Sequence, residues 1–229
     1  MFRKNDMIQQ NNAQSAPHDK TVHDRLLDAA EQLFSEQGFD ATSIRDLAAA
    51  TDCNIASVNY YFGGKENLYT EVWRRQLTVL RESRLVSIRK AISCTDGPPR
   101  LEELLASYAH AFVEPLADKA RSQRLIRLMA REIIDPHLPR GMFLTEMAKP
   151  TMTALEEALL KTCPHLDKSK IPVLIISLIG QLMHIMHVKT MFDQAQTADW
   201  PKLDLRQAIN DIVTFSAAGI RAFEEQNPQ

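Results

Sequence analysis

Apolar side chains recur at intervals of three and four residues through most of the chain, which is the period of an α-helix with one buried face. The first clear stretch runs from about Val22 to Gln37 and places Leu26, Ala30 and Phe34 on one side. The alternation of apolar and polar residues that is typical of strands is absent, and the sequence has only seven glycines. The pattern therefore predicts an all-α protein.

About nine helices are predicted, and their ends coincide with prolines, glycines and capping residues. Ser43 with Asp46, and Thr21 with Asp24, have the spacing of a capping box, and Asn54 is a further N-cap. The expected helices cover residues 22–37, 43–50, 55–61, 65–92, 100–116, 118–134, 140–162, 168–193 and 204–225.

The chain divides into a short tail and two unequal domains. Residues 1–20 are polar, rich in Gln and Asn, and are expected to be a disordered tail. Residues 21–66 hold the three short helices, and residues 67–229 form a larger α-helical domain that begins with a long connecting helix. The first 20 residues lack the apolar segment of a secretory signal, so we expect a cytoplasmic protein.

Composition narrows the possible functions. The chain has 229 residues, 45% of them apolar, and its 27 Lys and Arg against 29 Asp and Glu give a formal net charge of −2. This charge excludes proteins that coat nucleic acid through positive charge alone, so any DNA binding must come from a local site. The longest apolar run, Ile171–Ile179, is too short to span a bilayer and contains Pro172, so no transmembrane segment and no membrane partner are expected. Cys53, Cys94 and Cys163 are expected to be free thiols.

Two short helices joined by a tight turn form a helix-turn-helix pattern at residues 43–61. On the second of them, Ala56 allows the backbone to approach a partner closely, while Val58 and Phe62 share one side and are expected to pack in the core. Five other positions carry groups that can bond to phosphates or base edges: Asn54, Ser57, Asn59, Tyr60 and Tyr61. The pattern favours a DNA-reading helix.

At these residues the sequence resembles the TetR family of transcriptional regulators. The resemblance covers Thr21 to Tyr69 and includes ATSIRDLAAATDCNIASVNYYFGGKENLY. This variant looks most like the CecR subgroup, as does the later segment REIIDP. In this sequence Asn59 stands where the family most often has Tyr, and Tyr61 where it often has His.

The resemblance implies an Ω-shaped homodimer that places one recognition helix of each subunit in successive major grooves, and a C-terminal domain that binds a small inducer. It also implies which residues face the DNA, with the last of them at a phosphate: Thr42, Ser43, Arg45, Asn54, Ile55, Ala56, Ser57, Asn59, Tyr60, Tyr61 and Lys65.

The charge of the three-helix N-terminal domain, which we call the head, does not favour DNA binding. Residues 20–65 hold four basic and seven acidic side chains, a net charge of −3. Because Lys and Arg contacts to phosphates normally supply much of the affinity for DNA, two hypotheses stay open. Either affinity comes from dimerisation, backbone dipoles and the basic residues of the tail, or the head has lost DNA binding.

The last two predicted helices are apolar on more than one side, so each needs two partners. We expect them to pair with their two-fold mates in a homodimer, as in the resembled family, although the core of a monomer is the alternative. The interface residues would be Ile176, Ile179, Met183, His187, Ile212, Val213, Ala217 and Ile220.

Aromatic, thioether and a few polar side chains on the middle helices are candidates for a ligand pocket, although such residues are equally common in cores. They are Tyr108, Phe112, Met129, Glu132, Met142, Phe143, Met147 and His184. Arg124, Arg127 and Arg131 form a stripe opposite an apolar face, and we interpret them as a solvated surface rather than an anion clamp.

No catalytic or metal-binding motif is present. His184 and His187 have a spacing that suits two metal ligands, but no carboxylate accompanies them, so neither a metal nor a cofactor is predicted. The sequence lacks a H-E-x-x-H pair, an activated nucleophile and a phosphate-binding loop, so we expect no enzyme. The sequence favours a DNA-binding regulator, most simply a repressor that binds a palindromic operator as a homodimer and is released by a small molecule. The alternative is a helical dimer that sequesters a ligand or metal and no longer binds DNA.

Overall fold

The computed structural model describes residues 21–93, 99–116, 119–195 and 203–226, and within these ranges the chain is helical with short connections. The all-α prediction is confirmed there. The elements are α1 (Val22–Gln37), α2 (Ile44–Thr51), α3 (Ile55–Phe62), α4 (Lys65–Ser93), α5 (Leu101–Val113), a 3-10 turn η1 (Glu114–Leu116), α6 (Lys119–Ile134), a π-helical segment η2 (Leu144–Ala148), α7 (Lys149–Thr162), α8 (Ile171–Ala195) and α9 (Leu205–Glu225). The predicted tail at residues 1–20 lies outside the described residues.

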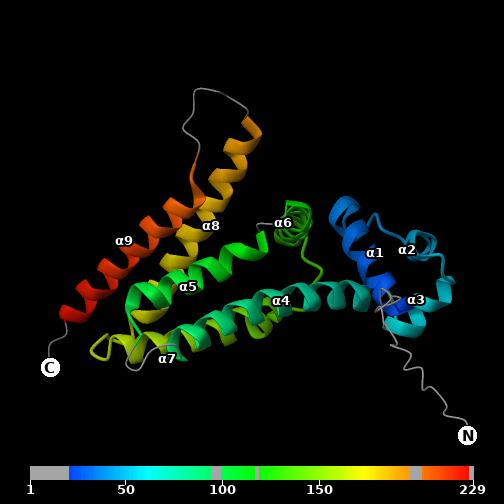
Figure 1. Ribbon diagram of the computed structural model, residues 1–229. Coiled ribbons are helices and arrows are strands. Elements are labelled where there is room, and N and C mark those ends of the chain that lie inside the picture. Colours follow the sequence, from blue (N-terminus) through cyan, green and yellow to red (C-terminus); the bar gives the residue numbers. More distant parts are fainter. Residues whose placement is uncertain (1–20, 94–98, 117–118, 196–202, 227–229) are drawn as a thin grey trace, which may run out of the picture.

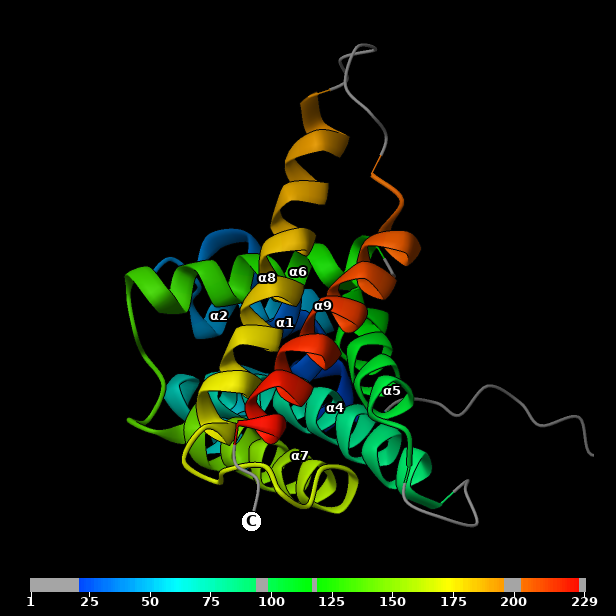
Figure 2. The ribbon, with the colours of Figure 1, turned by 90° about the vertical axis from the view of Figure 1, so that its left-hand side faces the viewer.

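The long helix α4 connects the two ends of the molecule (Figure 1). The three short helices α1, α2 and α3 lie at its N-terminal end, and α5 and α7 pack against its second half. Helices α8 and α9 form an antiparallel pair at the end away from α1–α3, and Figure 2 shows this pair side by side on the outside of the molecule.

The three head helices begin and end where the sequence predicts because their caps form. The Ser43 hydroxyl accepts the Asp46 N–H at 3.2 Å, and the Asp46 carboxylate accepts the Ser43 N–H at 2.9 Å. The Ser43 hydroxyl also donates to the Asp46 carboxylate at 2.7 Å, and this bond, followed by the one from the Ser43 N–H, lowers the pKa of Asp46. The Asn54 side chain accepts the Ala56 N–H at 2.9 Å and starts α3, and Gly63 ends α3 with a φ of 75°, which a glycine adopts without strain.

One core holds the head together and extends beyond it. It contains Phe34 and Val58 from the head, Trp73 from α4 and Leu128 from α6, all buried. The three short helices are therefore packed on the first half of α4 and on α6, so the apolar packing does not stop at the expected domain boundary between residues 66 and 67. The head and α6 therefore belong to one hydrophobic core.

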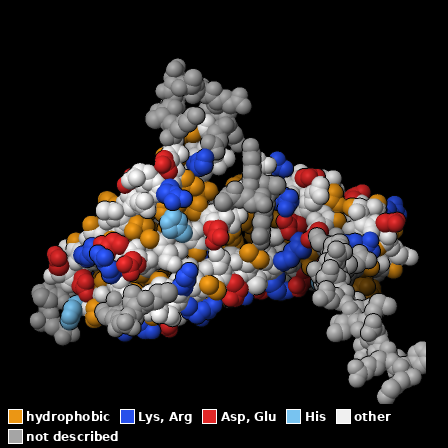
Figure 3. Space-filling model, in the orientation of Figure 1, with side chains coloured by type: hydrophobic (Ala, Val, Ile, Leu, Met, Phe, Trp, Pro, Cys, Tyr) orange, Lys and Arg blue, Asp and Glu red, His pale blue; other side chains and the backbone are white. Residues whose placement is uncertain are grey.

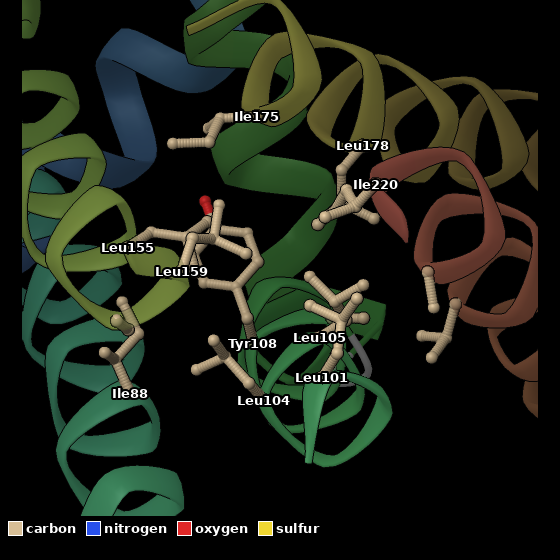
Figure 4. Packing of buried hydrophobic residues seen from close by; sticks show 14 of the residues in the cluster. Ile88, Leu101, Leu104, Leu105, Tyr108, Leu155, Leu159, Ile175, Leu178 and Ile220 are labelled. Carbon is tan, nitrogen blue, oxygen red and sulfur yellow. The ribbon is translucent and has the colours of Figure 1, made fainter. Parts of the chain in front are cut away.

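A second core fills the space between the end of α4 and helices α5, α7, α8 and α9. Figure 4 shows Ile88, Tyr108, Leu155, Leu178 and Ile220 converging from these five helices. Each of these side chains is buried. Burial of such side chains contributes roughly 1.5–3 kcal/mol each, which holds the C-terminal domain as one packed unit.

The sequence predicts one uninterrupted helix over residues 140–162, and the structure differs at η2. There the Lys149 N–H bonds to the carbonyl five residues back, as in a π-helix. Pro150 has no N–H, so it cannot donate to the carbonyl of Glu146, and Arg81 Nη1 donates to that oxygen instead at 2.9 Å. The proline and this arginine account for the irregular turn.

Helix α8 is apolar both on the side that packs in the core and on its exposed side. Residues Ile171–Phe192 are long and apolar enough to cross a membrane by length and composition, with a mean hydropathy of 1.9, and 22% of this stretch is buried. The prediction of no transmembrane segment used the shorter run Ile171–Ile179 and missed this property of the whole helix. Ile175, Leu178 and Leu182 form the inner side and pack in the second core. The outer side is apolar without a partner in the described chain.

Candidate DNA-binding face and ligand cavity

The outer face of α3 presents mainly uncharged side chains at one end of the molecule. Tyr60 is 83% exposed and Ile55 is 47% exposed, and Asn59 and Ala56 are exposed beside them. The ring of Tyr61 meets that of Tyr60 edge-on, with centroids 5.0 Å apart. Val58 and Phe62 are buried, as predicted. Helix α3 thus separates a core side from a side on which polar and aromatic groups project outward.

Three of the residues that the resemblance assigns to DNA contacts are engaged within the head. Thr42 is fully buried, and its hydroxyl donates to the Gly38 carbonyl at 2.7 Å. Lys65 Nζ donates to the carbonyls of Phe39 and Thr42 at 2.9 and 3.1 Å and lies 4.2 Å from the centroid of the Phe39 ring. Ser43 caps α2, and Arg45 is exposed on the same helix. Thr42 and Lys65 therefore stabilise the α1–α2 connection. Burial of Thr42 corrects its assignment to the DNA-facing residues, and the internal bonds of Lys65 favour a structural role over the phosphate contact that the resemblance implies.

The negative charge of the head is offset by arginines from other helices. Arg75 of α4 binds Asp28 at 2.8 Å and Glu31 at 2.6 Å, and Arg124 of α6 binds Glu31 at 3.2 Å. These arginines lie outside residues 20–65 and so were not counted in its net charge of −3. On the face drawn in Figure 3, acidic and basic side chains are interspersed. Two acids of α1 are thereby paired away from α3.

A cavity of about 290 Å³ lies between α4, α5, α6, the η2–α7 segment and α8. Its walls are apolar apart from one charged and one hydroxyl side chain. The residues lining it are Leu80, Arg84, Phe112, Leu125, Met129, Phe143, Met147, Ala148, Thr151, Met152, Ile179 and Met183. The volume is close to the small end of ligand pockets, which hold roughly 300–1,000 Å³.

Four of the eight predicted pocket residues line this cavity: Phe112, Met129, Phe143 and Met147. The other four lie elsewhere, which corrects their assignment. Tyr108 is buried in the second core and Met142 in the first. Glu132 is bonded to groups outside the cavity, and His184 is exposed on α8. The periodic spacing of apolar residues identified helices that line the cavity, but it did not show which face of each helix points into it.

The sequence analysis missed Arg84, the charged group of the cavity. The residue is 6% exposed, its Cζ lies 3.9 Å from the centroid of the Phe112 ring, and Nη1 lies 3.5 Å from Met147 Sδ. Its Nε has no hydrogen-bond partner. Burial lowers the pKa of Arg84, while Tyr108 raises it. Arg84 lies four residues after Leu80 and four before Ile88, so the helical period already places it on the buried side of α4, and this signal was not used in the sequence analysis.

Helix α6 connects this cavity to the head. On one side Leu125 and Met129 line the cavity. On another, Arg124 binds Glu31 of α1, and Arg131 Nη2 donates to the Glu36 carbonyl at the end of α1 at 2.7 Å. The arginine stripe is thus largely exposed, as predicted, but Arg124 and Arg131 also bind α1, which the prediction did not include.

The carboxylate of Glu132 secures the turn that follows α6. It accepts the Tyr69 hydroxyl at 2.9 Å and the backbone N–H groups of His137 and Leu138 at 3.0 and 2.8 Å. Burial raises the pKa of Tyr69, and Glu132 raises it further while Trp73 lowers it. Glu132 thus joins α6 to α4 and is not free to bind a ligand.

The outer side of the α8–α9 pair carries large exposed apolar side chains. On α8, Val173 is 65% exposed, and Ile176, Met183 and His187 are also exposed along the same stripe. On α9, Phe215 is 70% exposed. The exposed Ala218 and the half-buried Gly219, which has no side chain, follow it on α9, so a second backbone can approach closely.

Part of the predicted interface lies inside the subunit. Val213, Ala217 and Ile220 are buried in the second core against α5, which corrects their assignment. Ile212 is half-buried against the same core, and Ile179 lines the cavity. The sequence showed that α9 is apolar on two sides but did not show which side the core occupies.

One group of metal-binding side chain types lies in the described part of the chain, at the junction of the head and α6. Asp40, Asp135 and His137 place their ligand atoms within 4.8 Å of one another, and both carboxylates are exposed. His137 Nε2 lies 3.0 Å from the Asp135 carboxylate, and its ring centroid lies 4.2 Å from that of Phe39. These contacts give the histidine a packing role of its own. His184, His187 and His110 are exposed and do not join this group.

Two family models match the chain. Residues 26–72 match the model of bacterial regulatory proteins of the tetR family, and residues 101–220, more than half of the chain, match the C-terminal domain of the HTH-type transcriptional dual regulator CecR. Among curated relatives, "Probable HTH-type transcriptional regulator YttP" of Bacillus subtilis is 28% identical over 130 residues, which are 56% of this chain and 59% of YttP. The negative regulator IcaR of the Staphylococcus aureus biofilm operon icaADBC is 38% identical over 50 residues, which are 22% of this chain and 27% of IcaR. The chain thus spans less than two thirds of either relative.

Solved structures share the fold. The TetR-family regulator PfmR of Thermus thermophilus superimposes with a TM-score of 0.55 at 20% identity, covering 86% of this chain and 97% of PfmR. The regulator FadR of Bacillus subtilis, solved with stearoyl-CoA, gives 0.64 at 18% identity, covering 86% of this chain and 99% of FadR. The helix-turn-helix head, the arrangement of the helices and both family models agree, and the chain belongs to the TetR family of bacterial transcriptional regulators, with a C-terminal domain of the CecR type.

Proposed function

We propose that the protein is a ligand-responsive repressor that binds a palindromic operator as a homodimer in the cytoplasm. The observation that carries this proposal is the outer face of α3, where Tyr60 and Asn59 are exposed at the tip of the molecule without serving its core. Exposed polar and aromatic groups on a recognition helix suit the edges of bases in a major groove. The relative IcaR is named as a negative transcriptional regulator, which supports repression.

The homodimer would form through the outer sides of α8 and α9. Val173, Ile176 and Phe215 are large exposed apolar side chains that the subunit itself does not cover. A patch of this kind marks an interaction site, and a two-fold pairing of both helices would bury it as a four-helix bundle. The two heads would then sit at a fixed separation, as two half-sites about 34–36 Å apart require.

Helix α6 would transmit ligand binding to the head. Leu125 and Met129 line the cavity, and on the same helix Arg124 and Arg131 hold α1. A ligand that favours a different position of α6 therefore favours a different position of α1 and α3. Occupation of the cavity would shift the dimer toward a spacing that fits the operator poorly, and the affinity for DNA would fall.

Fluorescence anisotropy with DNA from upstream of the protein's own gene tests the proposal, at about 150 mM salt and with excess competitor duplex. We expect saturable binding that competitor does not remove. Tyr60→Ala and Asn59→Ala should weaken it by about 1–3 kcal/mol each, whereas Glu157→Ala, an exposed change on α7, should leave it unaltered.

Absence of specific binding, there and in a selection from genomic fragments, would contradict the proposal. It would instead favour a helical dimer that sequesters a ligand.

A further inference from the structure

The cavity contains one cation and no anion. Arg84 is the single charged side chain among the described residues that line it, and Thr151, its hydroxyl side chain, already donates to the Met147 carbonyl at 2.8 Å. The remaining walls are leucine, isoleucine, methionine, phenylalanine and alanine. The guanidinium is therefore the polar group left to bind an occupant of the cavity.

Arg84 lacks the partner that a buried arginine ordinarily has. Within the described ranges it forms no ion pair, its Nε has no acceptor, and its neighbours are the face of Phe112 and the sulfur of Met147. Buried charges in proteins are almost always paired, because removing an ion from water costs several kcal/mol. The ring and the sulfur offset only part of this cost. A retained cation of this kind suits a carboxylate that the described residues do not supply.

We propose that the cavity binds a small amphipathic monocarboxylate, with its carboxylate on the Arg84 guanidinium and its apolar body among the methionine and leucine side chains. A planar guanidinium matches a carboxylate with two parallel hydrogen bonds. A single cation balances one negative charge, so a phosphate dianion would remain half unpaired. The volume of about 290 Å³ favours a compact body. The proposal rests on the effector role of this cavity.

Calorimetry on the full chain at about pH 7.5, where carboxylates are ionised, tests the proposal. The probes are octanoate, decanoate and naphthalene-2-carboxylate, each compared with its neutral carboxamide. We expect at least one carboxylate to bind about tenfold or more tightly than its amide. Arg84→Met should abolish that preference, Arg84→Lys should keep part of it, and Arg89→Met, which removes an exposed charge from the same helix, should not change it.

Three results would overturn the proposal: equal affinities for carboxylate and amide, no carboxylate binding at about 1 mM, or a preference that survives Arg84→Met. Operator binding measured on the same samples separates the two proposals. A carboxylate preference without operator binding would refute the regulator and leave the anion site standing. Operator binding without any carboxylate preference would refute the anion site alone.

Discussion

The contact between α1 and α6 can be tested by removing one carboxylate. Glu31 is buried, and its oxygens accept hydrogen bonds from Arg75 and Gln76, each at 2.6 Å, and from Arg124 at 3.2 Å. Glu31→Gln keeps the size of the side chain but removes the charge that three donors share. Because the side chains of Arg75 and Arg124 are about a third exposed, water can replace part of the loss, and we expect a cost of about 2 kcal/mol. For a chain of this length this corresponds to about 4–8 °C in Tm.

A double-mutant cycle isolates the part of this energy that joins the two helices. Glu31→Gln, Arg124→Gln and the double variant are unfolded with urea at one protein concentration, because the proposed dimerisation would make stability depend on concentration. The N–O distance of 3.2 Å and the partial exposure of Arg124 predict a coupling of about 1 kcal/mol. The matched control is Arg127→Gln, which removes the same charge from an exposed position of α6.

The reasoning would be refuted by a coupling below about 0.3 kcal/mol, which is within the error of additivity. It would also be refuted if Arg127→Gln lowered stability as much as Arg124→Gln, since the effect would then reflect the charge of α6 rather than its contact with Glu31.

Four further predictions follow from single positions. Lys65→Met should lower stability by about 1–2 kcal/mol without changing the salt dependence of operator binding, whereas a phosphate contact would reduce the salt slope by about 1. Phe215→Glu should convert the dimer to a species of 26.0 kDa in sedimentation, and a wild-type protein that already sediments at that mass would contradict the interface. Burial, with Glu224, raises the pKa of Cys163 to about 12, so iodoacetamide should label it more slowly than Cys53 at about pH 8, as peptide mass mapping can check. Arg84→Met should raise the free energy of unfolding by about 1–2 kcal/mol in urea titrations of the ligand-free protein, because it removes an unpaired buried charge, and a loss of stability would contradict that account.

The helices could be predicted because their signals are local. The period of apolar residues and the caps set the bounds of α1 at Val22–Gln37, as predicted, and placed the end of α4 within one residue of Ser93. The capping box of Ser43 and Asp46 determines the start of α2 in the same way. Each of these features depends on residues within one or two turns, so a single sequence contains it.

The sites could be predicted only in part because they depend on what packs against each helix. The helical period places Arg124 and Arg131 on the polar side of α6, but it does not show that both also contact α1. It places Arg84 on the apolar side of α4 with Leu80 and Ile88, but it does not show that no carboxylate of the described residues faces it. On α9, the period showed two apolar sides, and only packing distinguished the buried Val213 from the exposed Phe215. The buried side of the recognition helix was easier to predict, because Val58 and Phe62 pack against neighbouring helices of the same small domain.

In the proposed regulator, the contacts between α1 and α6 limit the coupling between the cavity and the head, because a ligand changes operator affinity only through contacts that differ between the two states. Allosteric coupling of about 1–3 kcal/mol changes an affinity roughly 5–150-fold. The pair of Glu31 with Arg124 is worth about 1 kcal/mol, and Arg131, which is exposed, adds a hydrogen bond to the end of α1 that water partly replaces. Because Leu125 belongs both to the core of the head and to the wall of the cavity, an occupant that displaces α6 changes the packing of the head directly. In the proposed regulator, a ligand of about 290 Å³ that breaks the pair of Glu31 with Arg124 would change operator affinity about fivefold, and a displacement of Leu125 would add to this change.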